Sequence, residues 1–213
     1  MAETVEMHII ARVRSDFPTK FGIPRQSGLA DVPARIVFEP AYRNADALRG
    51  IEGFSHLWLI WQFSGAVREG WSPTVRPPKL GGNRRIGVFA TRSPFRPNEI
   101  GLSSVKLDRV ELHTPQGPVL HILGADLMDG TPIFDIKPYL AYTDSHPEAL
   151  GGFALARDAV RVDCPPELLA VFSPERREAL LRALAQDPRP GYQHEPGRVY
   201  GFAFAGREVR FTV

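Results

Sequence analysis

The chain has 213 residues, of which 43% are hydrophobic and 23% charged, proportions typical of a soluble globular protein. This length supports a core of ordinary size, in one domain or in one domain with a small appendage. The single cysteine, Cys164, excludes an internal disulfide bond and a metal site built from several cysteines, and we expect it to be a buried thiol.

The first predicted element is a strand near the N-terminus. Val5, Met7, Ile9, Ala11 and Val13 alternate with mostly polar neighbours, which is the two-residue period of a half-buried strand. Acidic residues precede this pattern, and the segment lacks the basic start and long apolar stretch of a secretory signal. We therefore expect a cytoplasmic protein.

Further short strands follow, separated by connections rich in glycine and proline. They are predicted at residues 34–38, 54–63, 86–90, 102–112 and 119–123. Asn44 is expected to cap a short helix that ends before Gly50. Short strands at this spacing favour an all-β barrel or sandwich, and a doubly wound nucleotide-binding sheet is a poor fit because no long helix is expected before Pro165. The apolar run 54–63 is about half the length of a membrane-spanning helix, so no membrane span is expected.

The character of the sequence changes near Tyr142, where AYTDSHPEALGG is polar and rich in turn formers. We place a domain boundary there. The prediction is a β-barrel domain at residues 1–143 and a small α+β domain at residues 144–213, so the chain is expected to be mainly β and of the α+β class overall.

The second part of the chain predicts one helix and one hairpin. Ser173 followed by proline is typical of a helix start, and helical spacing of apolar residues continues until Asp187. The strand-like runs 199–204 and 209–213 then surround Gly206, which predicts a closing hairpin.

The stretch ATRSPFRPNEIGLS, residues 90–103, predicts a stiff loop. Its two prolines fix their own backbone and restrict the residues before them, while Gly101 permits backbone angles or close approaches closed to other residues. A stiff loop that presents Arg92 and Arg96 suits recognition of an anionic or planar group. An ordinary surface loop is the alternative, because 22 of the 26 basic residues are arginines.

A basic stretch lies between Gly70 and Asn98, with six cations and no carboxylate. Clustering of this kind attracts a phosphate backbone, and a solvated basic loop without a partner is the alternative. The six cations are Arg76, Lys79, Arg84, Arg85, Arg92 and Arg96.

Several common chemistries lack support in the sequence. The six histidines are scattered without a pair at helical ligand spacing, so no metal site is expected. Neither a phosphate-binding loop ending in GK[ST] nor a G-x-S-x-G nucleophile elbow is present. His56, Trp58 and Trp61 lie in an apolar predicted strand; His56 is interpreted as a core residue, and the two tryptophans as core or interface residues.

Six motifs in chain order are more specific. They are PRQ-x-G at 24–28, G-x-E-x-FSHLW at 50–58, R-P-P-x-LGGN at 76–83, GVFATRS with RPN-x-IG-x-S at 87–103, DGTP-x-x-DIKPYL at 129–140, and DPRP at 187–190 followed by Tyr192. Together they resemble the TsaA/TrmO family of tRNA methyltransferases, and the matches span nearly the whole chain.

The resemblance implies an S-adenosylmethionine-dependent enzyme with a β-barrel domain that works as a homodimer. Members of this family methylate the N6 nitrogen of threonylcarbamoyladenosine, the modified base next to the anticodon of tRNA. The expected partners are therefore tRNA carrying that base and a second copy of the chain, with no membrane and no metal. Transfer of a methyl group from a sulfonium is an in-line displacement, so the protein mainly aligns donor and acceptor and excludes water.

The resemblance also implies roles for individual residues. Candidates for accepting the proton of the attacking nitrogen are Tyr139, Asp135 and Tyr192. The expected cofactor contacts are Gln26, Ser27, Gly28, Phe63, Ser64, Arg92, Leu102, Asp126, Leu127, Met128 and Asp129. Arg84, Arg85, Arg96 and Arg189 are candidates for contacts with the tRNA backbone, and plain surface arginines are the alternative. For the two aspartates of the cofactor set, turn formation is the alternative.

Two other functions stay open. One is a module that binds S-adenosylmethionine or RNA without transferring a methyl group, and the other is a methyltransferase of the same fold acting on a small molecule. Binding of tRNA that weakens steeply with added salt would favour an RNA substrate.

Overall fold

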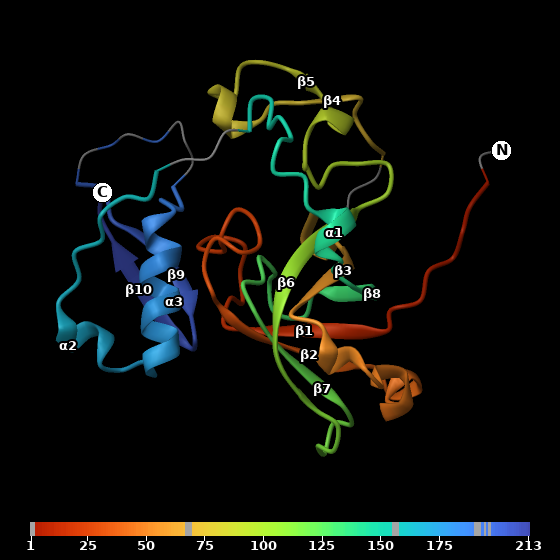
Figure 1. The fold of residues 1–213 in the computed structure, drawn as a ribbon. Coiled ribbons are helices and arrows are strands. Elements are labelled where there is room, and N and C mark those ends of the chain that lie inside the picture. Colours follow the sequence, from red (N-terminus) through yellow and green to blue (C-terminus); the bar gives the residue numbers. More distant parts are fainter. Residues whose placement is uncertain (1–2, 67–69, 155–157, 190–192, 194, 196) are drawn as a thin grey trace.

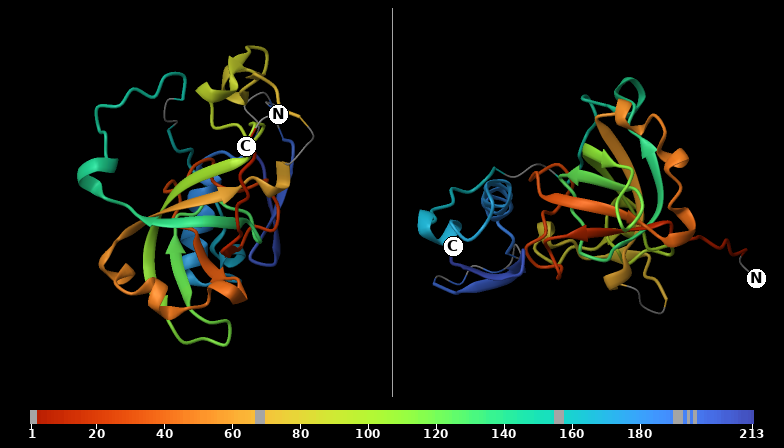
Figure 2. Two further views of the ribbon diagram at one scale, coloured as in Figure 1. Left: turned by 90° about the vertical axis from the view of Figure 1, so that its right-hand side faces the viewer. Right: turned by 90° about the horizontal axis from the view of Figure 1, so that it is seen from below.

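The computed structural model describes residues 3–66, 70–154, 158–189, 193, 195 and 197–213. Figure 1 shows two bodies side by side, a barrel of strands and a smaller unit built by the C-terminal part of the chain. The right-hand view in Figure 2 shows the same arrangement, with the N-terminal segment extending away from the barrel.

Six strands of the described chain close into a barrel in the order β1-β2-β7-β6-β3-β8. The predicted barrel is therefore confirmed. All neighbouring strands are antiparallel, and closure leaves no open sheet edge. The strands are β1 (Ala11–Ser15), β2 (Pro33–Phe38), β3 (His56–Gln62), β6 (Ile100–Glu111), β7 (Val119–Leu123) and β8 (Pro132–Pro138).

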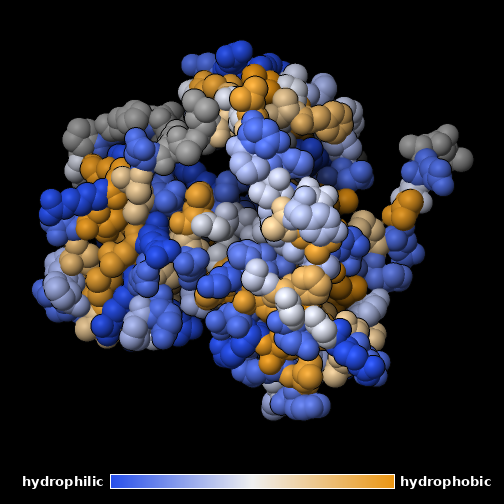
Figure 3. All heavy atoms as spheres, in the orientation of Figure 1, coloured by the Kyte–Doolittle hydropathy of each residue, from blue (hydrophilic) through white to orange (hydrophobic). Residues whose placement is uncertain are grey.

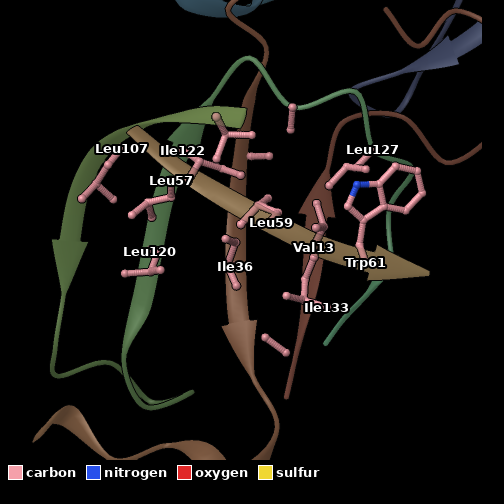
Figure 4. Close-up of a cluster of buried hydrophobic side chains, with 14 of the residues drawn as sticks. Val13, Ile36, Leu57, Leu59, Trp61, Leu107, Leu120, Ile122, Leu127 and Ile133 are labelled. Atoms are coloured by element: carbon pink, nitrogen blue, oxygen red, sulfur yellow. The ribbon is translucent and has the colours of Figure 1, made fainter. Parts of the chain in front are cut away.

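The barrel interior is filled by apolar side chains from every strand. Along β3, Leu57, Leu59 and Trp61 are buried and alternate with partly exposed neighbours, as a two-residue period requires. Figure 4 shows side chains from neighbouring strands meeting in this core. The core also includes Val13, Ile36, Leu107, Leu120, Ile122 and Ile133.

Two of the predicted strands differ most from the observed ones. The N-terminal strand begins only at Ala11, and Val5 is 80% exposed, because the pairing of β1 with its two neighbours ends at Phe38 of β2 and at Ile133 of β8. The strand predicted at 86–90 is reduced to β5 (Ile86–Gly87), which pairs with β4 (Thr74–Val75) in a separate ribbon.

Three other expectations are corrected. The sequence analysis did not predict β8, whose two prolines stand at its ends, where a proline disturbs few ladder hydrogen bonds. His56 is exposed, because it begins β3 on the outer face, and it is not a core histidine. Cys164 is partly exposed, because it lies in an extended connection before α2, and it is not a buried thiol.

Short 3₁₀ helices connect the strands. Asn44 caps η2 as predicted, with its side chain accepting a hydrogen bond from the backbone N–H of Asp46. None of the helices in the described ranges is both long and apolar enough to cross a bilayer. The 3₁₀ helices are η1 (Pro40–Tyr42), η2 (Ala45–Leu48), η3 (Ile51–Gly53), η4 (Ser64–Ala66), η5 (Pro78–Leu80) and η6 (Val88–Ala90).

After β8, α1 (Ala141–Asp144) lies on the barrel, where Trp58 Nε1 donates a hydrogen bond to Asp144 Oδ2 at 2.8 Å. The C-terminal part contains α2 (Pro166–Leu169), α3 (Pro174–Ala185), β9 (Tyr200–Phe204) and β10 (Arg207–Phe211). The predicted helix and hairpin are confirmed as α3 and the β9–β10 pair. Ala205 and Gly206 form the hairpin turn with positive φ, which matches the twist of the strands.

A second apolar cluster joins this unit to the barrel. It combines residues of α3 and β9 with Phe17, Ala30 and Val32, which lie between β1 and β2. Asp16 and Arg176 add a bidentate ion pair across the same boundary, with distances of 2.7 and 3.1 Å.

Candidate functional site

A cavity of about 250 Å³ opens at one end of the barrel core. Its walls are mainly apolar, and Trp61 and Leu127 lie close together at this end of the core in Figure 4. The polar groups in the lining include Lys20, Ser64 and Asp126. An apolar cavity with a few convergent polar groups is typical of a small-molecule site. The remaining lining residues are Ile23, Pro24, Gln62, Phe63, Gly65, Ala66, Pro94, Met128 and Thr131.

Trp61 forms one wall because the residue opposite it is glycine. Trp61 is only 8% exposed and is the cross-strand partner of Gly101. A Cβ atom at Gly101 would lie 2.3 Å from Cε2 of the indole ring. The close approach that the sequence suggests for Gly101 is thus made to a wall of the cavity, and the ring of Phe63 packs edge-on against Trp61 at 4.3 Å.

A chain of hydrogen bonds leads from this wall to a carboxylate. Trp61 Nε1 donates to Ser103 Oγ at 3.0 Å, and Ser103 Oγ donates to Asp126 Oδ1 at 2.6 Å. Burial raises the pKa of Asp126, and the hydrogen bond from Ser103 opposes this rise. The site therefore holds a carboxylate in an environment that penalises its charge, and a cation or hydroxyl donor placed there would stabilise it.

The predicted cofactor residues Gln26, Ser27 and Arg92 gather near Asp126. Arg92 donates a hydrogen bond to the side-chain oxygen of Gln26, and its positive charge helps to hold down the pKa of Asp126. The backbone of Ser27 also hydrogen-bonds to the Asp126 carboxylate. Gly28 is fixed beside them, since its N–H donates to the carbonyl of Gly124 at 2.9 Å.

The six remaining predicted cofactor residues divide between the cavity and other surfaces. Phe63, Ser64, Leu127 and Met128 line the cavity. The side chain of Leu102 is 56% exposed on the outer face of β6, where it alternates with the inward Ser103. Asp129 accepts a hydrogen bond from the N–H of Ser15 at 3.1 Å and faces a different groove.

Neither Asp135 nor Tyr139, two of the predicted proton acceptors, lines this cavity. Asp135 forms an ion pair with Lys137 at 2.9 Å, and its cross-strand partner is Ile60, whose side chain lies on the outer face of β3. Tyr139 packs its ring against Trp58 with centroids 5.5 Å apart. Tyr192 lies outside the described residues.

The arginines predicted to contact RNA differ in their exposure and in the hydrogen bonds that they make within the protein. Arg84 and Arg85 are exposed, and Arg85 donates to Thr74 Oγ1 at 3.2 Å. Arg96 instead stabilises its own loop, donating to the carbonyl of Thr91 at 2.7 Å. Arg189 makes a bidentate pair with Asp187, with distances of 2.8 and 2.9 Å.

Aromatic side chains accompany the basic loop, which the sequence analysis did not single out. Trp71 is 51% and Phe89 is 72% exposed, and their ring centroids lie 6.1 Å apart. Hydrophobic surface is visible at the top of Figure 3, where Figure 1 places β4 and β5. The position of Trp71 and Phe89 within the basic stretch 70–98 is the signal in the sequence that could have identified them.

Arg25 connects the edge of the cavity to the C-terminal part. Its guanidinium donates to the carbonyl oxygens of Asp187 at 2.8 Å and of Arg189 at 2.6 Å. Its neighbour Pro24 lines the cavity. Arg25 therefore holds the turn at residues 187–189 beside the cavity.

Histidine, cysteine and acidic side chains nowhere gather in threes that could hold a metal ion within the described ranges. Fold and site together define a closed antiparallel barrel with a small-molecule cavity at one end of its core and a C-terminal unit beside it.

The chain belongs to the TrmO family. Residues 12–145 match the tRNA-methyltransferase O N-terminal domain, and residues 162–213 match the TrmO C-terminal domain. The chain is 41% identical to an Escherichia coli tRNA (adenine(37)-N6)-methyltransferase over 96% of this chain and 91% of that protein.

Two Pseudomonas aeruginosa proteins are also similar. One, described as a candidate S-adenosylmethionine-dependent methyltransferase, is 44% identical over 90% of this chain and 85% of its own length. The other is TrmO, whose crystal structure superposes on this chain with a TM-score of 0.77 at 34% identity. The superposition covers 100% of this chain and 92% of the TrmO chain.

Proposed function

We propose that the protein transfers the methyl group of S-adenosylmethionine to N6 of adenine 37 in tRNA, next to the anticodon. The observation that carries this proposal is the 41% identity to a tRNA (adenine(37)-N6)-methyltransferase along nearly the full length of both chains. We further propose that the substrate base carries a threonylcarbamoyl group, as the sequence motifs imply.

The cavity has the chemistry needed for this cofactor. Trp61, Phe63 and Leu127 offer apolar walls for an adenine ring. Asp126 is a carboxylate whose raised pKa would fall beside a positively charged sulfonium, and it can also accept from ribose hydroxyls. Lys20, which donates to the carbonyl of Gly65, provides a cation for the amino-acid carboxylate. The bound cofactor would supply an electrophilic methyl group.

The protein's own residues would orient the reactants and exclude water. We assign the cofactor contacts to Gln26, Ser27, Gly28, Phe63, Ser64, Arg92, Asp126, Leu127 and Met128. The hydrogen bonds from Trp61 through Ser103 fix the position of Asp126. Leu102 would contribute through its backbone, and Asp129 by holding the turn after Met128.

We also propose that two copies of the chain associate through the outer face of β3, β6 and β8. Ile60 and Leu102 are cross-strand partners there, and Ile100 is exposed beside them. Asp135 and Tyr139 belong to the same side of the barrel. Association through this face would place these proton acceptors near a second copy, where they could meet the reacting base.

The basic loop and the C-terminal turn are the proposed RNA contacts. Trp71 and Phe89 can stack on unstacked bases, and Arg84 and Arg85 can contact phosphates. Arg96 and Arg189 would act by holding their loops in place. A protein acting on tRNA in this way is expected in the cytoplasm.

The experiment is to incubate the purified protein with S-adenosylmethionine and two tRNA preparations, one carrying threonylcarbamoyladenosine and one lacking it. Mass spectrometry of the nucleosides should show a methyl-sized gain on that nucleoside alone. Asp126→Asn should reduce the gain, and Asp46→Asn, which changes an exposed carboxylate on η2, serves as the control. Cofactor binding without any gain in mass would indicate a binding module. In a parallel incubation with threonylcarbamoyladenosine as the free nucleoside, methylation of that nucleoside would indicate a small-molecule enzyme.

A further inference from the structure

A row of three arginines and one histidine crosses four neighbouring strands on the outer face of the barrel. Arg14 on β1 is the cross-strand partner of Arg35 on β2, and Arg35 is the partner of His121 on β7. His121 is in turn the partner of Arg109 on β6. The sequence does not reveal this row, because its members are separated by up to 107 positions, from Arg14 to His121, and meet only through barrel closure.

The row lies in a groove between the barrel and α3, separate from the cofactor cavity. The groove has a volume of about 410 Å³, and Arg176 of α3 contributes to its lining. Asp129 faces this groove, whereas its chain neighbours Leu127 and Met128 line the cavity. The segment that carries Asp126 to Asp129 therefore divides the two sites.

The carboxylates in the groove do not satisfy all of its cations. Arg176 pairs bidentately with Asp16, and Arg109 pairs with Asp108 at 2.9 Å and Glu111 at 3.3 Å. Arg14 lies 3.7 Å from Asp129, at the outer limit of an ion pair. The guanidinium group of Arg35 has no hydrogen-bond or ion-pair partner among the residues described.

His121 adds an unsatisfied polar atom. Its Nε2 is buried and 3.1 Å from Glu111 Oε1, but the approach does not have hydrogen-bond geometry, so the atom lacks a hydrogen-bond partner in the described chain. Burial and the charge of Arg109 lower the pKa of His121. Like charges directly opposite each other across a sheet are destabilising, so a bound anion would stabilise the arrangement of Arg14 and Arg35.

We propose that this groove binds the sugar–phosphate backbone of the RNA substrate, at a second contact separate from the cofactor cavity. Three strand-to-strand intervals make the row about 14 Å long, which suits consecutive phosphates better than a single small anion. Arginines supply the forked donors that phosphate oxygens accept. The inference rests on the proposed function, since it takes tRNA as the ligand.

The test measures binding of fluorescently labelled tRNA by Arg14→Gln/Arg35→Gln between 50 and 400 mM salt. The control, Arg49→Gln/Arg161→Gln, removes the same charge from two exposed positions outside the groove. We expect the groove variant to bind about 5- to 20-fold more weakly at low salt, with a salt dependence shallower by about one unit per arginine. Because like charges are removed, the groove variant should melt no lower than the wild type.

Three outcomes would count against the proposal. If the groove variant binds tRNA as the control does, the groove is not an RNA contact. If the groove variant loses only its response to inorganic phosphate, followed by the NMR signals of His121, the site takes small anions instead of RNA. If the wild type does not bind tRNA, an RNA role is excluded. Wild-type protein that binds tRNA through the groove but fails to methylate it would overturn the proposed function and leave the groove standing.

Discussion

The indole ring of Trp61 packs directly against Gly101, so Gly101→Ala is the sharpest test of how this wall of the cavity is built. The added Cβ would lie 2.3, 2.4 and 2.7 Å from three atoms of a buried indole ring. Real Cβ atoms do not make such contacts, so either the ring or strand β6 must shift. The ring cannot shift freely, because Phe63 packs against it and Ser103 accepts its N–H.

The expected cost has two parts. Overpacking a well-filled core costs about 1–3 kcal/mol. Disturbing the hydrogen bond from Trp61 to Ser103 adds about 0.5–1.5 kcal/mol. A loss of about 2–4 kcal/mol in the free energy of unfolding would lower the melting temperature by roughly 5–15 °C in a chain of this length.

The assay is thermal unfolding combined with calorimetric titration of S-adenosylmethionine. Gly87→Ala is the matched control, since a Cβ there meets no atom within 4 Å. In a double-mutant cycle, replacing Trp61 with leucine should restore part of the stability lost in Gly101→Ala. A melting temperature within about 2 °C of the wild type, with unchanged cofactor affinity, would refute the reasoning.

Three further predictions concern other parts of the chain. Asp126→Asn should be at least as stable as the wild type at neutral pH and should bind the cofactor more weakly. Because the pKa of Asp126 is raised in the folded state, its stabilising contribution is present at low pH and is lost as the pH rises. Urea unfolding should therefore give free energies of unfolding for the two proteins that approach each other as the pH falls. Asp144→Ala should remove the hydrogen bonds from the N–H of Leu140 and from Trp58, which lower the pKa of Asp144. The loss of stability should be largest at neutral pH and should vanish as the pH falls through that lowered pKa. Tryptophan fluorescence that does not change in the variant would argue against the hydrogen bond from Trp58 to Asp144. Gly22→Ala combines positive φ with a Cβ 2.3 Å from the ring of Phe202, and should lower the melting temperature by several degrees more than Gly50→Ala, which shares the positive φ but not the contact.

Local patterns predicted most of the strands, but pairing partners decided where they end. Val5 and Met7 continue the alternation of β1, yet they are exposed because they pair with neither of the strands beside β1. The opposite error occurred at β8, where Asp135 and Lys137 interrupt the apolar pattern, although β3 pairs with this segment along its length. Tertiary pairing therefore overrode local propensity in both directions.

The candidate site was predicted in part for a similar reason. The residues that gather near Asp126 lie in stiff loops that the sequence marks clearly. The opposite orientations of Asp126 and Asp129 depend on the irregular path between them, which no periodicity describes. Trp61 was interpreted as a core or interface residue, and it is both a core residue and a wall of the cavity, because the cavity opens directly from the barrel interior.

The shared apolar cluster has a consequence for synthesis of the chain. Phe17, Ala30 and Val32 are made early, but the residues that cover them, such as Phe172 and Phe204, are made near the end. A nascent barrel would carry this apolar patch until the last strands leave the ribosome. We expect chains cut short before α3 to aggregate, and an isolated C-terminal fragment to lack part of its own core, so that each half depends on the other for solubility.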